Sequence, residues 1–230
     1  MEKIDKIFAG LDVSTQSIKI ILINFSNHSI IYKDSISFDD DLPKYDTTNG
    51  TISNTSNKIS ESDPLMWIDG LNILFKRLKK ETNLIPKIKS ISVSGQQHGL
   101  VAIDENGNLT KSTAKLWNDN STQDECDILT RRLGGVDKMI SEIGNTQRPG
   151  YTASKILHMY RNERSSFDMT HSFLLVHNYI NWFLSGGKIC MEPGDASGTA
   201  LFNPVKKSWS KKILNTISKE LVDKLPNIKP

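Results

Sequence analysis

Cysteine is scarce in this chain, which has only two among its 230 residues. Cys126 and Cys190 lie far apart in the sequence, and neither belongs to a Cys-x-x-Cys pair. Disulfide-stabilised small domains and cysteine-ligated metal sites need several cysteines at short spacings. The sequence therefore argues against both kinds of site, and we expect two buried, reduced thiols.

The sequence also lacks an excess of one charge and a long apolar run. Lys and Arg total 29 against 26 Asp and Glu, a net charge of +3, and the basic residues are scattered. Nucleic acid is therefore not an expected partner. The charged start, Met1 to Lys6, leads into a short apolar run that fits neither a signal peptide nor a membrane span. We expect no membrane partner and a cytoplasmic location.

No internal repeat and no linker rich in Pro, Gly or Ser divides the chain. Hydrophobic residues make up 37% of it, which is enough to fill an ordinary core. We therefore predict that residues 1–230 form one domain.

The first 94 residues predict three strands, a helix and a fourth strand. Short β-branched runs at 7–11, 18–23 and 30–36 are separated by turn-forming residues, and a long polar surface excursion follows at 39–62. Asp63 and Pro64 suit a helix start, and the apolar residues after them keep a helical spacing (Trp67, Leu71, Leu74, Phe75 and Leu78). Residues 88–94 alternate apolar and polar, as a half-buried strand does.

The remaining chain is mainly helical in pattern. Residues 100–104 predict a second hairpin arm that turns at Asn106-Gly107. Helices are predicted at 121–133, 136–143, 153–163, 178–184 and 209–221. The order strand, strand, strand, helix, strand is that of the ribonuclease-H-like α/β core of actin, hexokinase and sugar kinases, with a mixed sheet and surrounding helices. We predict this fold class, although many mixed α/β domains begin in the same way.

Residues 10–19 carry the first candidate site, between the first two predicted strands. A tight turn there would expose backbone N–H groups and the Ser14 and Thr15 hydroxyls beside the Asp12 carboxylate. These groups can bind phosphate and its metal ion. The alternative is that they are ordinary turn residues.

Two later segments suit a polyhydroxy ligand. Gln97 and neutral His98 can each donate and accept hydrogen bonds at adjacent sugar hydroxyls, and the Trp117 ring can pack on the carbon face of a sugar. Taken alone, His98 could equally be a hydrogen-bonded structural residue, and Trp117 a core residue before a helix cap.

Taken together, these segments resemble the FGGY carbohydrate kinases. Residues 12–17 resemble the family's first phosphate loop, residues 94–99 (Ser-Gly-Gln-Gln-His-Gly) the sugar segment of its xylulokinases, and residues 116–119 its Trp-Asn-Asp segment. Matches at 61–67, 148–155, 194–199 and 209–210 extend the resemblance from residue 7 to about residue 218. Ser14 replaces a common glycine and Ser121 a bacterial arginine, as in animal-type xylulokinases.

The resemblance implies a kinase that uses ATP and Mg²⁺ to convert D-xylulose to D-xylulose 5-phosphate. It implies that Asp12 takes part in catalysis by holding the metal ion through water, and that Ser14, Thr15 and Gln16 bind phosphate. The sugar-binding residues that it implies are Gln97, His98, Trp117, Asp119 and Asp195. The partners expected are thus a small sugar and ATP, and a homodimer is compatible with them.

The family's catalytic base, an aspartate in a Gly-Gly-Gly-Asp-Asn segment, has no counterpart in these 230 residues, and neither do its adenosine motifs. We therefore expect an N-terminal, sugar-binding portion or a truncated product that does not phosphorylate sugar by itself, the nucleotide-binding domain being absent from this chain. The alternatives are another FGGY kinase (a gluconokinase, ribulokinase or polyol kinase) and a non-catalytic sugar-binding module.

Overall fold

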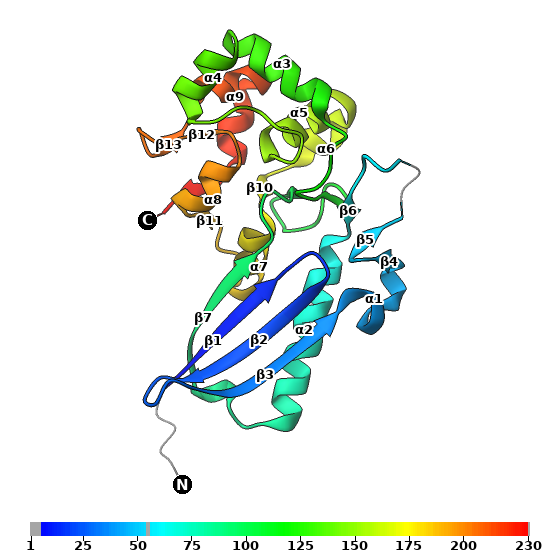
Figure 1. Cartoon of the computed structure of the whole chain (residues 1–230), viewed down its shortest axis with the longest axis vertical. Coiled ribbons are helices and arrows are strands. Elements are labelled where there is room, and N and C mark those ends of the chain that lie inside the picture. The colour runs from blue at the N-terminus through cyan, green and yellow to red at the C-terminus, as the bar shows by residue number, and fades with distance from the viewer. Residues whose placement is uncertain (1–5, 54–55, 230) are drawn as a thin grey trace. The chain divides into compact units, whose positions relative to one another are not determined.

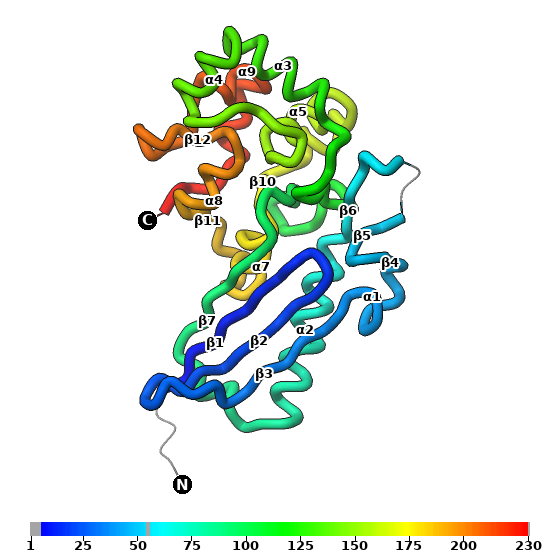
Figure 2. The backbone as a smooth tube through the Cα atoms, viewed as in Figure 1, coloured from blue at the N-terminus to red at the C-terminus, as the bar shows by residue number. Residues whose placement is uncertain are grey.

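The computed structural model describes residues 6–53 and 56–229. Most of the charged start, on which the prediction about a signal peptide rests, lies outside the described residues. The chain separates into two compact units: unit 1 comprises residues 1–53 and 62–96, and unit 2 comprises residues 54–61 and 97–230. The backbone passes from unit 1 to unit 2 after Gln96, directly beyond β7 (Figure 2). That the whole chain acts as one domain stays a prediction.

Unit 1 is built on a four-stranded sheet with the order β3-β2-β1-β7 (Figure 1). Its strands are β1 (Ile7–Val13), β2 (Ser17–Asn24), β3 (Ser29–Ser37) and β7 (Ile88–Gly95). The first three pair antiparallel, and β7 lies parallel to β1. This confirms the predicted meander and the mixed sheet of the ribonuclease-H-like class.

Alternation along β1 and β2 decides which face of the sheet is covered. Ile7, Ala9, Leu11 and Val13 are buried, and the residues between them point to the other face. Helix α2 (Pro64–Glu81) covers the buried face (Figure 1). A Cβ at Gly70 of this helix would lie 2.6 Å from the Ile36 side chain, so helix and sheet are in close contact. Asp12 is therefore left on the face opposite α2.

The start of α2 follows the predicted chemistry. The Asp63 carboxylate accepts a hydrogen bond from the Leu65 N–H at 2.8 Å, and Pro64 occupies the first helical position. Of the five apolar residues at helical spacing, four are buried and Phe75 is half-buried. The helix face was thus correctly predicted.

The polar excursion between β3 and α2 has its own short elements. They are α1 (Phe38–Asp41), a 3-10 turn η1 (Pro43–Tyr45), β4 (Thr47–Thr48), β5 (Thr51–Ile52) and β6 (Glu61–Ser62). Strands β4 and β5 form a hairpin. The Asp39 carboxylate accepts hydrogen bonds from the Thr47 hydroxyl and the backbone N–H groups of Asn49 and Gly50, at 2.7, 2.6 and 2.9 Å. This carboxylate therefore holds the hairpin turn.

Unit 2 is mainly helical. Helices α3 (Gln123–Leu133), α4 (Val136–Ile143), α5 (Thr152–Asn162), α6 (Arg164–Met169) and α9 (Lys211–Ile217) gather around one apolar core (Figure 1). A smaller core lies beside α7 (Val176–Leu184) and α8 (Pro193–Gly198). Four predicted helices agree with α3, α4, α5 and α7 to within a few residues, whereas α6 and α8 were not predicted.

Short strands complete unit 2. Strand β8 (Val101–Ile103) pairs with β10 (Ser172–Leu174), β11 (Cys190–Met191) with β14 (Asn227–Ile228), and β12 (Phe202–Asn203) with β13 (Ser208–Trp209). The remaining short elements are β9 (Ala114–Lys115) and the 3-10 turns η2 (Ile85–Lys87), in unit 1, and η3 (Lys219–Lys224).

Three expectations from the sequence need correction. A helix over 209–221 was wrong, because Trp209 belongs to β13, the Ser210 hydroxyl caps α9, and the helix gives way to η3 after Ile217. The turn at Gly107 exists, but the main partner of β8 is β10, so 100–104 is not simply one arm of a hairpin. Cys126 is buried as expected, whereas Cys190 is exposed, because it sits in a two-residue strand at the surface.

Gly50 offers a test of how closely the hairpin and the loop after β1 fit together. Its φ is +73°, and a Cβ there would lie 1.9 Å from the Thr15 carbonyl oxygen. Gly186 has nearly the same φ, +71°, with open space around it. In urea unfolding, Gly186→Ala should cost about 1 kcal/mol, the backbone strain alone, and Gly50→Ala should cost roughly 1–3 kcal/mol more. Equal losses in the two variants would contradict this close approach.

Candidate active site

The loop after β1 forms a tight turn in unit 1. The Ser14 N–H and its hydroxyl both donate to the Ser17 carbonyl oxygen at 3.0 Å. The Thr15 hydroxyl donates to Gln96 Oε1 at 3.3 Å, and the Gln96 N–H donates to the Val13 carbonyl oxygen at 2.9 Å. Gln16 is exposed. The loop thus has the backbone turn expected of a phosphate-binding segment, and Gln96 supports it from β7.

Ser14 stands where the resemblance would place glycine, and the backbone explains why serine fits. The described non-glycine residues with left-handed φ do not include Ser14. The position therefore has no conformational need for glycine, and the serine hydroxyl adds hydrogen bonds to Ser17 that glycine could not make.

Asp12 lies near the end of β1, between Lys19 on β2 and Ser94 on β7. These residues help to line a shallow cavity of about 360 Å³ in unit 1, together with Gly10, Leu11, Ile21, Ser92 and Val93. Mg²⁺ usually keeps several waters and binds one or two carboxylates plus substrate phosphates. Asp12 is the one carboxylate among the residues that line this mainly apolar cavity, so it could hold a metal ion only together with water and ligand phosphates.

His98 is the centre of the second candidate site, in unit 2. Its backbone is left-handed, with φ 63°, and its ring lies 4.8 Å from the Tyr151 ring. A Cβ at Gly198 would lie 2.8 Å from His98 Cε1, so only glycine leaves room for the imidazole. His98 Nδ1 is buried beside the Gly198 backbone, and no well-formed hydrogen bond to it occurs among the described residues. Gln97 beside it is exposed.

The surroundings of His98 keep its imidazole neutral. Burial lowers its pKa below the ordinary 6.5, and the positive charge of Lys155 lowers the pKa further. A weak polar contact with the Gly198 backbone and the nearby Asp195 carboxylate raise the pKa, without reversing the shift. A neutral imidazole has one donor and one acceptor nitrogen, which suits neighbouring sugar hydroxyls.

Trp117 lies two residues before Asp119, and its side chain is 51% exposed. That exposure is unusual for so large an apolar side chain. A Cβ at Gly150 would lie 2.3 Å from the Trp117 carbonyl oxygen. The backbone after α4 therefore presses directly on the Trp117 peptide group. The alternative of a core tryptophan does not hold.

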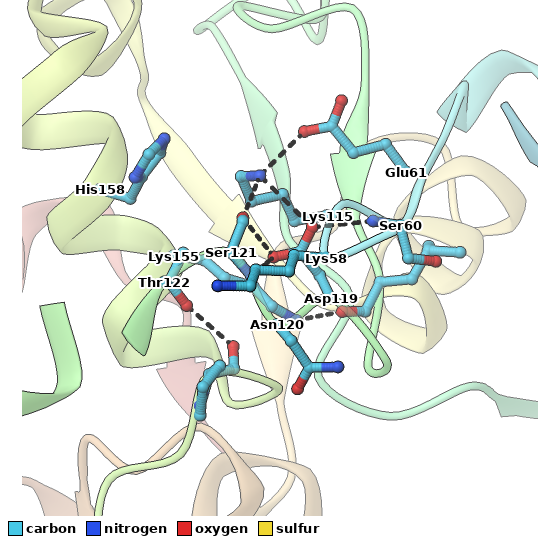
Figure 3. Close-up of polar contacts among 12 residues, drawn as sticks. Lys58, Ser60, Glu61, Lys115, Asp119, Asn120, Ser121, Thr122, Lys155 and His158 are labelled. Atoms are coloured by element: carbon cyan, nitrogen blue, oxygen red, sulfur yellow. Dashed lines mark hydrogen bonds and ion pairs between the residues drawn. The ribbon is translucent and has the colours of Figure 1, made fainter. Parts of the chain in front are cut away.

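Asp119 is fully buried and has four hydrogen-bond partners (Figure 3). One carboxylate oxygen accepts from the Ser60 N–H at 2.9 Å and from Lys115 Nζ at 3.4 Å. The other oxygen accepts from the Ser121 N–H at 3.0 Å and the Ser121 hydroxyl at 2.6 Å. These bonds occupy the carboxylate, which has room for about four. A sugar contact by Asp119 stays a prediction that this geometry does not favour.

Lys115 supplies the positive charge of this cluster. Its ammonium lies 3.2 Å from Glu61 and donates to the Ser121 hydroxyl at 2.8 Å (Figure 3). The sequence suggested that the arginine of bacterial sequences was simply lost at Ser121. The structure instead places a lysine from β9 beside Ser121, so the Asp119 carboxylate keeps a cationic partner. Nothing in the spacing of Lys115 from the motif signals this role.

The sequence patterns did not indicate Lys155 as a site residue. Its side chain lies almost wholly buried on α5. Its Nζ donates to the carbonyl oxygens of His98, Leu116 and Gly150, at 2.7, 2.7 and 2.8 Å. Burial lowers the pKa of Lys155 from 10.5 to about 7, and the Asp119 carboxylate opposes that shift. The three carbonyls also favour the ammonium form, because a neutral amine has only two N–H donors.

Asp195 lies in the first turn of α8 but does not cap the helix; the Glu192 carboxylate accepts from its N–H instead. Asp195 Oδ2 lies 2.5 Å from His177 Nδ1, and Asn181 Nδ2 lies 2.8 Å from His177 Nε2. His177 therefore orients Asp195. His177 lies outside the Asp195 segment in the sequence, so no motif indicated that the two residues pair.

In unit 2, then, the contacts bring His98, Trp117 and Asp119 to neighbouring backbone segments, and Asp195 lies close enough to act on the charge of His98. The sequence pattern of the FGGY family of carbohydrate kinases, N-terminal domain, matches residues 7–230. The chain belongs to this family.

Individual FGGY relatives agree with that assignment. Xylulose kinase of Haemophilus influenzae is 33% identical over 219 residues, which are 93% of this chain and 42% of that protein. Xylulose kinase of Mus musculus is 24% identical over 235 residues, 94% of this chain and 42% of that protein. A ligand-bound xylulose kinase from Lactobacillus acidophilus has the same fold, with a TM-score of 0.80 at 22% identity over 97% of this chain and 43% of its own.

The chain spans about two fifths of the length of the curated relatives that it matches. Within residues 6–53 and 56–229, no helix combines the length and apolarity that crossing a membrane requires.

The Asp119 cluster gives a stability prediction with a built-in control. Asp119→Ala leaves the buried Lys115 ammonium with one carboxylate partner fewer and the Ser60 N–H unpaired, and should cost about 3–5 kcal/mol in urea unfolding. Asp168 forms an i,i+4 pair with Arg164 that is 49% exposed on both sides, so Asp168→Ala should cost at most about 1 kcal/mol. Similar losses in the two variants would show that the buried cluster does not stabilise the fold.

His98 gives a pH prediction. Because its folded-state pKa lies below 6.5, the unfolded chain binds more protons near that pH. The resulting stability is fully present above 6.5 and is lost as the pH falls through the folded-state pKa. Histidine NMR signals should show a midpoint for His98 below 6.5 in the folded chain and a normal midpoint in denaturing urea. A folded-state midpoint at or above 6.5 would contradict the buried, neutral imidazole.

Proposed function

We propose that this chain is the sugar-binding N-terminal part of an ATP-dependent xylulose kinase, which converts D-xylulose and ATP to D-xylulose 5-phosphate and ADP. The observation that carries the proposal is the segment Gln97-His98-Gly99. Its imidazole is half-buried, lies beside the Tyr151 ring and is kept neutral. Because Nδ1 is enclosed by protein, Nε2 is the ring nitrogen that we assign to the sugar. The names of the relatives support the choice of sugar.

The proposed sugar site lies in unit 2. His98 and Gln97 would hydrogen-bond adjacent hydroxyls, Trp117 would pack on the carbon face of the sugar, and Asp195, oriented by His177, would accept a further hydroxyl. We assign Asp119 to holding the turn that carries Trp117, because its oxygens already have partners within the protein. This arrangement combines one aromatic face with a few fixed polar groups, as sugar sites require.

The proposed phosphate side lies in unit 1. The exposed Gln16 would donate to phosphate oxygens of ATP, and Asp12 would hold water on the Mg²⁺ ion that ATP carries. The Ser14 and Thr15 hydroxyls would donate to phosphate by exchanging their present bonds to the Ser17 carbonyl and to Gln96. The bound metal ion would neutralise phosphate charge. Positioning and charge neutralisation are the main needs of phosphoryl transfer, so these residues should affect turnover more than sugar affinity.

Other parts of the function are also proposals. No Gly-Gly-Gly-Asp-Asn segment occurs in these 230 residues, so the proton acceptor would come from elsewhere in a complete enzyme. A cytoplasmic location and a homodimer likewise stay proposals. Gluconate, ribulose and glycerol are the rival acceptors within the family, and a non-catalytic sugar-binding module is the rival outside it.

Direct sugar binding tests the proposal without requiring catalysis. In calorimetry, the 230-residue chain should bind D-xylulose more tightly than D-gluconate, D-ribulose or glycerol. His98→Ala should weaken D-xylulose binding by about 1–3 kcal/mol, roughly 5- to 140-fold in Kd, because hydroxyls lose their partner.

The control for this experiment is His171→Ala, which removes an exposed histidine of the same unit. Its affinity should match that of the unmodified chain. Tighter binding of gluconate, ribulose or glycerol would transfer the proposal to that substrate, and equal affinity in His98→Ala would remove His98 from the site.

A further inference from the structure

Lys155 is unusual for a lysine, because it is buried and forms no ion pair through a direct hydrogen bond with any residue that the structure describes. Its side chain is among the largest that are fully buried, with a relative exposure of 1%. All three donors of its ammonium are used, and all three acceptors are main-chain carbonyl oxygens within 2.8 Å. A buried charge is expensive unless it is fully hydrogen-bonded, so an apolar side chain would fill this position at lower cost. The position of the three carbonyls must therefore explain the lysine.

Each carbonyl belongs to a segment of the proposed sugar site. The first is the carbonyl of His98 itself, the second belongs to Leu116, directly before Trp117, and the third to Gly150, directly before Tyr151. Tyr151 in turn packs on the His98 ring, and Gly150 presses on the Trp117 carbonyl. One ammonium thus connects three segments that are distant in sequence and that carry the His98, Trp117 and Tyr151 rings.

The His98 backbone shows why such a connection is needed. A left-handed φ is uncommon for a residue with a side chain and persists only where surrounding contacts enforce it. The Lys155 ammonium donates to the carbonyl of this same residue at 2.7 Å, and hydrogen bonds from charged donors are stronger than neutral ones. The Thr152 hydroxyl reaches that carbonyl only at 3.5 Å. Lys155 is therefore its principal partner among the described residues.

We propose that Lys155 is the positioning residue of the sugar site, which fixes His98 and Trp117 relative to one another without touching the sugar. The inference rests on the proposed function, because it assigns Lys155 to the same site. The charged and titratable groups around the ammonium are Asp119, Lys115 and His98. The Asp119 carboxylate, the Lys115 ammonium and the His98 imidazole make no direct hydrogen bond to Lys155 Nζ. The three main-chain carbonyls are its only hydrogen-bond acceptors among the described residues.

Sugar affinity in a small set of variants tests the proposal. Lys155→Met keeps most of the apolar stem but removes every donor, and Lys155→Gln, also one atom shorter than lysine, keeps two N–H donors without the charge. By calorimetry on the 230-residue chain, Lys155→Met should bind D-xylulose on the order of ten-fold or more weakly, because misplacement of site groups by less than 1 Å has effects of this size. Lys155→Gln should recover part of that loss.

The matched control is Lys111→Met. Lys111 forms an ion pair with Glu163 in the same unit, and that pair involves none of the proposed sugar-binding residues. Its D-xylulose affinity should stay within about two-fold of the unmodified chain, as for a mutation distant from the site. Thermal unfolding of each variant shows which of them are folded.

A measurement on the unmodified chain covers the case in which Lys155→Met does not fold. With ¹⁵N-labelled lysine, the Nζ signal of Lys155 should be visible, because three hydrogen bonds slow its exchange, and it should shift on saturation with D-xylulose. The Lys111 signal should not shift. A Lys155 signal that stays in place at saturation would overturn the proposal.

The outcomes separate the two claims. If the unmodified chain does not bind D-xylulose or any other sugar of the panel, the sugar site itself is refuted and this inference falls with it. If the unmodified chain binds D-xylulose and a folded Lys155→Met binds it equally well, the sugar site stands and only the positioning role is refuted. A ten-fold loss, partly recovered in Lys155→Gln and absent in Lys111→Met, supports the positioning role.

Discussion

The contact on which the proposed sugar site depends is the one between the buried Lys155 ammonium and three main-chain carbonyls. Side chains that recognise a sugar need a rigid backbone beneath them, and two of these carbonyls belong to or adjoin the residues that carry the His98 and Trp117 rings. The same charge helps to keep His98 neutral. One buried cation thus supports the backbone of His98 and adds to the effect of burial, which is the main cause of the neutral imidazole. A hydrophobic residue in its place could fill the volume but would remove a charged hydrogen bond from each of the three carbonyls, of which Leu116 also accepts from the Asp119 N–H and His98 from the Thr152 hydroxyl.

A second buried network repeats this logic with a carboxylate. Asp119 accepts four hydrogen bonds from Ser60, Lys115 and Ser121, and so holds the turn that follows Trp117. In unit 1, Asp39 accepts three hydrogen bonds from the hairpin that lies against the loop after β1. In each case a buried or half-buried charged group organises backbone that carries no regular secondary structure. The candidate site residues can then lie in loops without losing a defined geometry.

Local patterns in the sequence were sufficient for much of the fold. Short β-branched runs predicted β1, β2 and β3, and alternation predicted β7. The Asp63-Pro64 start with helical spacing predicted α2. These signals all arise within a few residues. The error at 209–221 arose because an apolar spacing continued through Trp209, although the capping hydroxyl of Ser210 starts the helix later. Strand β10 was missed because its three residues pair with β8, which lies far away in the sequence.

The candidate site was likewise predicted in part. Residue types and spacing were sufficient to propose Asp12, His98 and Trp117 as site residues, and the family resemblance added Asp195, since motifs are contiguous in sequence. They could not indicate Lys115, Lys155 or His177, because the partners of these residues come from segments that only folding brings together. They also could not show that Asp119 is enclosed by protein donors, which changes its proposed role from ligand to support.

The central claim is that a sugar binds in unit 2 against an imidazole and an indole that Lys155 holds in place. A crystal structure of the chain with D-xylulose tests it most directly. The account predicts sugar hydroxyls within hydrogen-bond distance of His98 and Gln97, the Trp117 ring against the sugar carbons, and no contact between the sugar and Lys155. D-Xylulose bound elsewhere in the chain, or bound directly by the Lys155 ammonium, would contradict it.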